Sequence, residues 1–289
     1  MMTSKNITRL FKNYIINKPA FFLSESLYVK YIVFISKLNG AFTNLKIEKY
    51  SKISVEKFPQ LFIHKITVGK KQIMFQNGYR ISRFIKGFEF AGQRMWRRYN
   101  IVEIIGQETP KAILDVGANI GEFSYYANSA FSGALKIIAV EPDPVVLNCL
   151  RFNLQETSIY IEPIAVSNKS NTSKFYLKPA TADSSFHAPA GDSIEVNVAR
   201  STLDSIIDKY GLGAPILVKM DCEGHEPEAL LGLIVNVHKV KWISIDTGPE
   251  RLGKCTTNEV LNILTQSGFT EITTHKSNIV TAVRTIQSF

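Results

Sequence analysis

The spacing of apolar and polar residues changes near Lys111 of this 289-residue chain. Beyond that point, short apolar runs alternate with longer segments in which apolar residues recur at helical spacing. The apolar runs are AILDV (112–116), KIIAV (136–140), IYIEPIAV (159–166), ILVKM (216–220) and WISI (242–245). Strands that alternate with helices predict an α/β fold, with a mostly parallel sheet and helices on both faces. Such sheets bind ligands beyond the carboxyl ends of their strands, so we expect the chemistry directly after each run.

The N-terminal third of the chain follows a different pattern. Residues 1 to about 56 predict basic amphipathic helices. FIHKITV (62–68) alternates apolar and polar residues and is followed by a GKK turn and QIMF, which predicts a β-hairpin. Helical spacing returns from Arg80, with breaks expected at Gly87 and Gly92. The sequence therefore predicts a helical and hairpin N-terminal region in front of the α/β domain.

Charge divides the chain in a similar way. The whole chain has a formal net charge of +9, but residues 1–100 hold 19 Lys and Arg residues against four acidic ones, a net of +15. We expect a basic N-terminal region over residues 1–75 and a second domain over residues 76–289. A basic front end predicts a polyanionic partner, such as nucleic acid, an anionic membrane surface or a phosphorylated substrate. Solvated helix faces are the plainer explanation of the same charges.

Composition limits the cellular setting. With 45% apolar residues the chain can bury a large core. Cys149, Cys222 and Cys255 form no CxxC pair, so neither a disulfide framework nor a structural zinc site is indicated. The apolar stretch at residues 20–38 is interrupted by charged residues, which argues against a transmembrane helix and a signal peptide. The sequence predicts a cytoplasmic protein that its basic front end could hold peripherally at an anionic membrane.

The residues after the first apolar run, DVGANIGEF, have the pattern of a cofactor-binding loop. Gly117 and Gly121 let the backbone turn tightly and approach a ligand, and a helix begins directly afterwards. Asn119 stands where the GxGxxG motif has its second glycine, and the acid Asp115 at the loop mouth would repel a pyrophosphate. The loop therefore suits a cationic ligand better than a nicotinamide dinucleotide.

Glu141 ends the second apolar run, twenty residues after Gly121. A carboxylate at this point can accept hydrogen bonds from both hydroxyls of a ribose. Helix capping is the alternative for an acid that follows a strand. The glycine loop before it favours the ribose.

Five motifs in a fixed order give these features a family resemblance. They are DVGANIGEFS (115–124), EPDP (141–144), AVS (165–167) with a hairpin after it, STLDSII (201–207) and VKMDCEGHE (218–226). Together they resemble the FkbM-type family of S-adenosylmethionine-dependent methyltransferases. The resemblance covers residues 75–289, and residues 1–75 have no counterpart in it.

This resemblance implies a seven-strand Rossmann-like sheet and S-adenosyl-L-methionine as the cofactor. The glycine loop would hold the methionine part, the acid after the second strand the ribose, and the backbone after the third strand would lie beside the adenine. The cofactor-binding residues that it implies are Asp115, Gly117, Ala118, Asn119, Gly121, Glu141, Pro142, Ala165, Val166 and Asp221.

The resemblance also places VKMDCEGHE beside the reactive methyl group. A hydroxyl acceptor needs a base to take its proton, and the candidates are Asp221, Glu223 and His225. His225 is a natural base because an unperturbed histidine titrates near neutrality, and Asp221 is the alternative. His225 also precedes Glu226 and Pro227, which signal a helix start, so a local structural role for it stays open.

A divalent metal is a further candidate ligand. Asp221 and Asp246 follow adjacent strands in a sheet of this type and could hold Mg²⁺ against a deprotonated hydroxyl. Structural capping by either acid is the alternative.

A cluster of arginines and aromatic residues precedes the first strand of the α/β region. Arg94, Trp96, Arg97 and Arg98, with Tyr99 beside them, could bind a phosphate or a sugar ring through bidentate and stacking contacts. The alternative is a helix whose aromatic residues pack inward while its arginines remain solvated.

Together, these features predict an O-methyltransferase that acts on a hydroxyl of a sugar, a glycan or a glycosylated metabolite. The sugar is implied by the resemblance alone. The rival is an RNA 2′-O-methyltransferase that binds phosphates through the basic N-terminal region. A non-catalytic, membrane-associated protein that binds the cofactor is the third candidate.

Overall fold

A computed structural model gives the structure of the protein. It describes residues 27, 28, 30–32, 34, 54–58, 63–68, 70–178, 183–188 and 193–285. The chain divides into two compact units, Met1–Ala91 and Gly92–Phe289, so the division comes later than the predicted boundary at residue 75. The basic helices predicted for residues 1–56 lie almost wholly outside the described residues. Within the described part of the chain, no helix has the length and apolar character needed to span a bilayer.

The first unit contains a small antiparallel sheet. Its strands, in spatial order, are β1 (Ser54–Phe58), β2 (Ile63–Val68) and β3 (Lys71–Gln76). Ile66 pairs with Ile73 across the hairpin, and both are fully buried. The hairpin predicted from the alternation in FIHKITV is therefore confirmed. A 3₁₀ helix, η5 (Gly78–Arg83), follows it.

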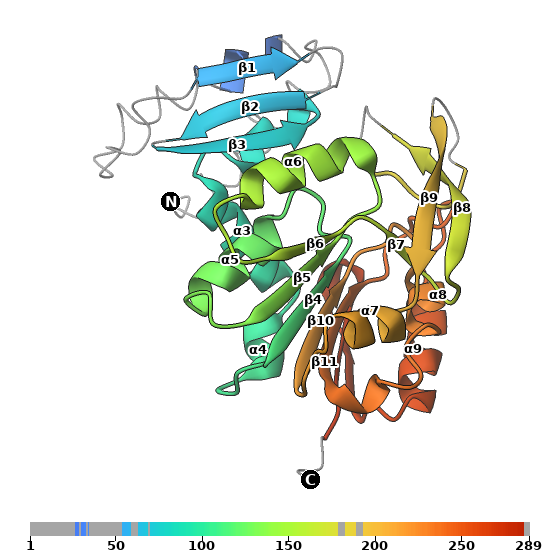
Figure 1. Ribbon diagram of the computed structural model, residues 1–289. Coiled ribbons are helices and arrows are strands. Elements are labelled where there is room, and N and C mark those ends of the chain that lie inside the picture. The colour runs from blue at the N-terminus through green and yellow to red at the C-terminus, as the bar shows by residue number, and fades with distance from the viewer. Residues whose placement is uncertain are drawn as a thin grey trace, which may run out of the picture. The chain divides into compact units, whose positions relative to one another are not determined.

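The second unit is built on a seven-stranded sheet (Figure 1). Its spatial order is β12 (Glu271–Thr274), β13 (Ile279–Val283), β11 (Val240–Asp246), β10 (Ile216–Met220), β4 (Ala112–Val116), β5 (Lys136–Val140) and β6 (Tyr160–Glu162). β13 is antiparallel to both of its neighbours, β12 and β11, and the other pairs of the sheet are parallel. The prediction of a mostly parallel sheet is confirmed, and β4, β5, β10 and β11 end at the same edge.

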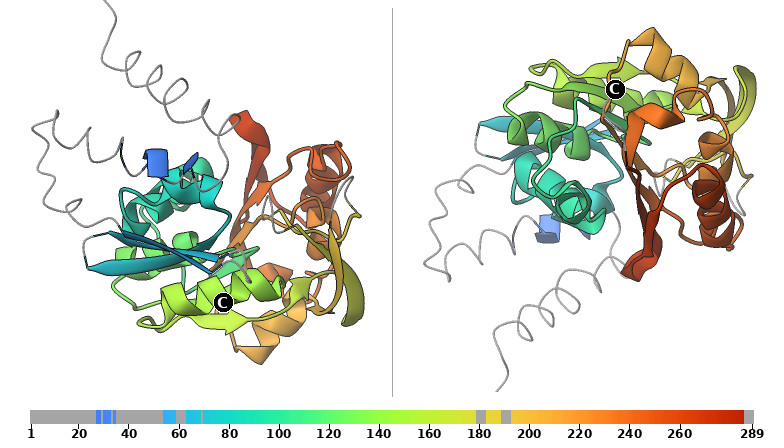
Figure 2. Two further views of the ribbon diagram at one scale, coloured as in Figure 1. Left: turned by 90° about the horizontal axis from the view of Figure 1, so that it is seen from above. Right: turned by 90° about the horizontal axis from the view of Figure 1, so that it is seen from below.

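Both faces of this sheet are apolar because side chains alternate along each strand. Ile113 and Leu217 face one core, and Leu114 and Val218 face the other. The first face is covered by the end of α3 (Phe88–Arg98), by α4 (Ile101–Ile105) and by α5 (Glu122–Ala130). The second face is covered by α7 (Leu203–Lys209), α8 (Glu226–Leu230) and α9 (Thr257–Gln266). Figure 2 shows these helices on the two sides of the sheet.

The apolar run at residues 159–166 forms two strands in different sheets. β6 ends at Glu162 and pairs in the main sheet, whereas β7 (Ala165–Val166) belongs to a small sheet with β9 (Ile194–Ser201) and β8 (Asn171–Leu177). Pro163 separates them, because a proline has no N–H to donate to a neighbouring strand. The single strand that the apolar run suggested is wrong, and the hairpin after β7 matches the expected one.

The two expected helix breaks have different outcomes. Gly87 has a φ of +93° and precedes α3, so that break is confirmed. Gly92 lies inside α3, and the expected break there is wrong. A Cβ atom at Gly92 would lie 2.2 Å from the Glu122 carbonyl oxygen, so this glycine allows α3 to pack closely against α5.

Candidate active site

The glycine loop joins β4 to α5 at the carboxyl edge of the sheet. The N–H groups of Gly117 and Ala118 donate to Val140 O at 3.0 and 2.9 Å, which holds the loop against β5. Gly117, Asn119 and Gly121 have φ values of +70°, +51° and +92°. These left-handed residues turn the chain sharply at the end of β4, as the two glycines predicted.

Glu141 lies at the end of β5, next to the glycine loop. Its Oε2 accepts from Asn119 N and its Oε1 from Asp143 N, both at 2.9 Å. Each carboxylate oxygen can accept a second hydrogen bond, so both can still meet a hydroxyl. Burial, and then the charge of Asp143, raises the pKa of Glu141 to about 8. Asp143, not Glu141, caps α6 (Pro144–Leu154), since its Oδ1 accepts from Val145 N and Val146 N.

Asp115 lies beneath the loop and not in a position to touch a ligand. Its side chain is 0% exposed, with Oδ2 accepting from Ser124 Oγ at 2.6 Å and Oδ1 lying 3.1 Å from Lys219 Nζ. Lys219 Nζ also donates to Gly117 O at 2.8 Å. The expected direct contact of the Asp115 side chain with the cofactor is therefore corrected. This carboxylate and its buried lysine support the loop from below.

The expected adenine-binding segment is buried. Ala165 and Val166 are 4% and 3% exposed, and their backbone contact with adenine stays a prediction. Ser167 is fully buried, and its Oγ lies 3.1 Å from His225 Nε2. Its hydroxyl is thus engaged within the protein. Pro142 is half-buried and follows the ribose-binding candidate directly.

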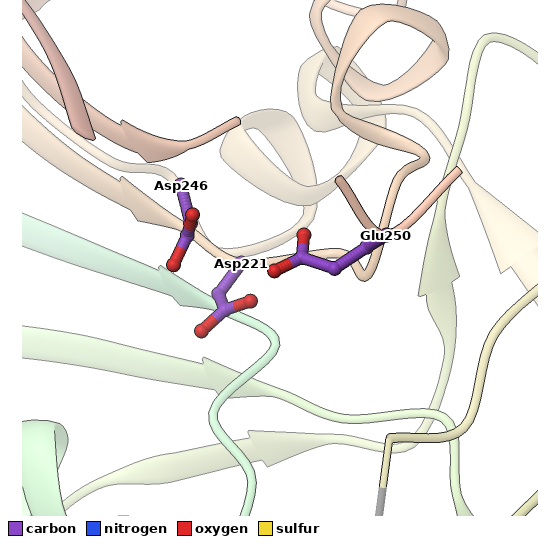
Figure 3. Close-up of side chains that lie close together, drawn as sticks. All are labelled: Asp221, Asp246 and Glu250. Carbon is purple, nitrogen blue, oxygen red and sulfur yellow. The ribbon is translucent and has the colours of Figure 1, made fainter. Parts of the chain in front are cut away.

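Three carboxylates gather where β10 and β11 end (Figure 3). Asp221, Asp246 and Glu250 each offer an oxygen, and these atoms lie within 4.8 Å of one another. We call these three residues the acid cluster. Two consecutive residues at the end of α3 meet it: Arg98 Nη2 pairs with Asp246 Oδ2, and Tyr99 Oη donates to Asp221 Oδ2 at 2.6 Å. The expected proximity of Asp221 and Asp246 is present, and Glu250 was not anticipated.

The acid cluster holds an excess of negative charge. Burial, followed by the charge of Asp221, raises the pKa of Asp246 to about 6. Burial, followed by the charges of Asp221 and Asp246, raises the pKa of Glu250 to about 8. Glu250 Oε2 is buried without a hydrogen-bond partner among the described residues. A cation at this edge would relieve the mutual repulsion.

The acid cluster could hold a metal ion or the cationic part of a ligand. Mg²⁺ prefers carboxylate oxygens, and three are close enough to share one ion. However, Arg98 and Tyr99 already donate to two of the three acids. A metal would have to replace or share these donors.

His225 does not have the surroundings of a strong base. It is 7% exposed, with Nε2 near Ser167 Oγ and Nδ1 3.5 Å from Glu228 Oε2. The Phe186 ring lies 4.3 Å from its own ring, centroid to centroid. Burial lowers the pKa of His225 to about 4, and the opposing effect of Glu228 is smaller. The ring is thus enclosed by Ser167, Glu228 and Phe186, whereas Asp221 lies in the acid cluster at the edge of the sheet, so the geometry favours the alternative, Asp221.

Glu226 organises the turn that carries the remaining candidates. Its Oε1 accepts from Cys222 N at 2.9 Å and Gly224 N at 3.1 Å, and its Oε2 accepts from Thr256 Oγ1 at 3.1 Å. The carboxylate is fully buried, and burial raises its pKa to about 7. Glu223 lies in this turn with a φ of +51°, and its participation in catalysis stays a prediction.

The arginine and aromatic cluster separates into buried and exposed members. Trp96 is 3% exposed, stacks on Phe123 and donates from Nε1 to Phe123 O at 3.4 Å. Its expected contact with substrate is wrong, because the side chain belongs to the core under α3. Arg94 and Arg97 are exposed, and Arg98 is 43% exposed beside the acid cluster. Of these four residues, Arg98 is the one whose side chain pairs with the acid cluster in the described part of the chain.

Lys219 and Glu250 were not predicted as site residues, and Tyr99 was predicted as part of the arginine and aromatic cluster but not as a partner of Asp221. Lys219 stands inside the apolar run ILVKM, and Tyr99 stands before α4, so neither position signals a ligand. Glu250 follows Asp246 by four residues, in the loop after β11. Its position after an apolar run is the sequence signal for Glu250.

Comparison with known proteins identifies the family. The profile described as methyltransferase FkbM domain matches residues 115–270, more than half of the chain. The chain belongs to the FkbM methyltransferase family. The matched range contains the glycine loop, Glu141 and the acid cluster, and it ends before β12.

Two methyltransferases are similar in sequence to this chain. The chain is 21% identical over 164 residues to the hexuronic acid methyltransferase AglP of Haloferax volcanii. The aligned region covers 53% of this chain and 66% of AglP. It is 28% identical over 155 residues to the 31-O-demethyl-FK506 methyltransferase FkbM of Streptomyces tacrolimicus. This aligned region covers 42% of the chain and 58% of that protein. The chain thus spans less than two thirds of either relative.

Solved methyltransferase structures also align with this chain, at low TM-scores. The precorrin-6Y C5,15-methyltransferase of Geobacter metallireducens matches with a TM-score of 0.40 and 14% identity, over 65% of this chain and 87% of that chain. The strand order given above for the FkbM-family domain follows from the hydrogen bonds between its strands.

The residues at this edge fit S-adenosylmethionine, the cofactor that the FkbM family and the fold imply. Gly117 gives the loop close backbone contact with the end of β10. Glu141 offers two acceptor oxygens to a ribose, and the acid cluster offers negative charge to a sulfonium. A pyrophosphate would be repelled by the same acids.

Proposed function

We propose that this FkbM-family protein transfers a methyl group from S-adenosylmethionine to a hydroxyl oxygen. The observation that carries the proposal is the meeting of three elements at one edge of the sheet. These are the glycine loop after β4, Glu141 after β5, and the acid cluster after β10 and β11. The first two elements suit the binding of a nucleoside. The acid cluster suits the binding of a cation and contains a carboxylate that can accept a proton.

The acceptor that we propose is a hydroxyl of a sugar, a glycan or a glycosylated metabolite. Its support is the activity of the two relatives, of which one is named for a hexuronic acid and the other for a demethylated FK506. We further propose that the protein works in the cytoplasm, with its basic front end available for an anionic membrane.

In the proposed mechanism, Asp221 is the general base. S-adenosylmethionine, when bound, would supply an electrophilic methyl group to the acceptor oxygen. Asp221 would take the hydroxyl proton of the acceptor from its place in the acid cluster. Glu141 orients the ribose, and the loop at Gly117 fixes the distance from the end of β4 to Asp221. Placement of the acceptor carries much of the rate, and the base adds about 10²–10⁴-fold.

The test has a binding arm and a transfer arm. Calorimetry should give a measurable affinity for S-adenosylmethionine, and NAD⁺ should not bind. Incubation with methyl-labelled cofactor and cell extract should then label the glycan or small-molecule pool. Label in the RNA pool would contradict the sugar acceptor and support the RNA 2′-O-methyltransferase. Cofactor binding without label in any pool would favour the non-catalytic alternative, and failure to bind would overturn the proposal.

A further inference from the structure

Tyr99 is a buried residue whose polar end reaches the acid cluster. The side chain is 0% exposed, and its hydroxyl donates to Asp221 Oδ2 at 2.6 Å. Ser244 Oγ donates to the Tyr99 carbonyl oxygen at 2.6 Å, which ties the backbone to β11. The ring meets Phe123 edge-on, with centroids 6.3 Å apart. Backbone, ring and hydroxyl are thus each held by a different contact.

The charged neighbours of Tyr99 fix its hydrogen-bond direction. Burial raises the pKa of Tyr99 well above its usual value, and the charges of Asp221 and Asp246 raise it further. Lys219 Nζ lies 5.2 Å from the ring centroid, and Arg98 lowers the pKa of Tyr99 by less than burial raises it. The phenol therefore keeps its proton at neutral pH and can only donate it to the carboxylate.

We propose that Tyr99 is a positioning residue for Asp221, and this inference rests on the proposed function. Its hydroxyl occupies Oδ2 from the buried side, so Oδ1 is the oxygen left to take the acceptor's proton. A phenol in this place selects one rotamer of the carboxylate.

A purely structural tyrosine would behave differently when its hydroxyl is removed. Loss of packing or of a buried hydrogen bond changes the free energy of unfolding but not the titration of the site. Loss of the Tyr99 hydroxyl removes a dipole whose positive end faces the acid cluster, so Asp246 and Glu250, with pKa values of about 6 and 8, should take up protons at higher pH. The two possibilities are therefore separated by a pH profile.

The pH profile can be measured without knowing the acceptor. S-adenosylmethionine carries a sulfonium charge that S-adenosylhomocysteine lacks, so the ratio of their affinities reports negative charge beside the sulfur. We expect this ratio to rise with pH in the native protein between pH 5.5 and 8.5. In Tyr99→Phe the midpoint should move up by about one pH unit, while the affinity for S-adenosylhomocysteine stays within about twofold.

Tyr210→Phe is the matched control. Tyr210 Oη also donates to a carboxylate at 2.6 Å, but that carboxylate is Glu162, which is paired with Lys209. The control should keep the native midpoint. Replacing Tyr99 with 3-fluorotyrosine, a stronger donor of the same shape, should move the midpoint down, and this holds even if Tyr99→Phe is too unstable to study.

The outcomes separate the two proposals. A Tyr99→Phe profile that superposes on the native one, or an equal shift in Tyr210→Phe, would overturn the assignment of Tyr99. Failure of the native protein to bind either nucleoside would overturn the proposed function, and the assignment would fall with it.

Discussion

Gly117 lies so close to Asp221 that a Cβ atom on the glycine would stand 1.8 Å from the Asp221 carbonyl oxygen. The backbone of the cofactor loop and that of the base are therefore in direct contact. Asp221 N also donates to Val116 O at 3.0 Å, which closes the same junction from the other side. The two halves of the site, cofactor loop and proton acceptor, are held at one fixed separation.

Replacing Gly117 with alanine should damage both halves of the site. The new methyl group would collide with backbone, and the φ of +70° is unfavourable for alanine. We expect a loss of at least about 2 kcal/mol in the free energy of unfolding, with cofactor affinity reduced by more than tenfold. Gly213→Ala is the control, because no atom lies within 4 Å of its added Cβ. Equal melting temperatures for the two variants would contradict the close contact.

Glu141 should give cofactor binding a pH dependence. Burial raises its pKa to about 8, and an ionised carboxylate accepts hydroxyl hydrogen bonds more strongly. We expect S-adenosylhomocysteine, which carries the ribose without the sulfonium charge, to bind more tightly as pH rises from 6.5 to 8.5. Glu141→Gln should weaken it by about tenfold and remove the dependence, as measured by calorimetry.

A neighbouring acid provides the control for this measurement. Glu162 ends β6, the next strand, and is paired with Lys209 and Tyr210. Glu162→Gln should keep both the affinity and its pH dependence. A dependence that survives in Glu141→Gln would show that the ribose is bound elsewhere.

The two candidate bases should differ sharply in their effect on turnover. Asp221→Asn removes the proton acceptor, so we expect kcat to fall by about 10²–10⁴-fold. His225→Gln keeps a donor near Ser167 and removes a group whose pKa is lowered to about 4, so kcat should fall by less than about tenfold. Initial rates with the acceptor found by labelling, at saturating cofactor, would check this order. The reverse order would restore His225 as the base.

Removal of divalent metal should leave the reaction unchanged. Arg98 and Tyr99 already donate to Asp246 and Asp221, and the sulfonium supplies a further positive charge during turnover. We expect dialysis against a chelator to change kcat and cofactor affinity by less than about twofold. A loss of rate that Mg²⁺ restores, and that Glu250→Gln abolishes, would instead assign the acid cluster to a metal.

The sequence predicted the sheet because its signals are local. β4, β5, β10 and β11 each coincide with a predicted apolar run, and the two glycines predict the tight turn after β4, whereas β12 and β13 were not among the predicted runs. The expectations for Gly92 and Trp96 were wrong for the opposite reason. Gly92 serves the approach of α3 to α5, and Trp96 fills the core beside Phe123, and both contacts join segments far apart in the chain.

The site was predictable where its residues follow an apolar run. Glu141, Asp221 and Asp246 were found in this way, and they lie at one edge of the sheet as expected. The role of Lys219 and the contact of Tyr99 with Asp221 were not predicted, because the partners of a buried polar side chain cannot be identified from the sequence. His225 stays a candidate base, but its burial, which the sequence does not show, lowers its pKa to about 4.

The pairing of Lys219 with Asp115 beneath the loop constrains how this protein can change over time. Replacing the lysine alone would strand a carboxylate in the interior, which typically costs about 3–5 kcal/mol. Replacing both with apolar residues of similar volume would avoid that loss but release Gly117 O. Natural variants should therefore keep the two positions together or lose them together. An alignment of close homologues, in which the two columns change jointly, would record that history.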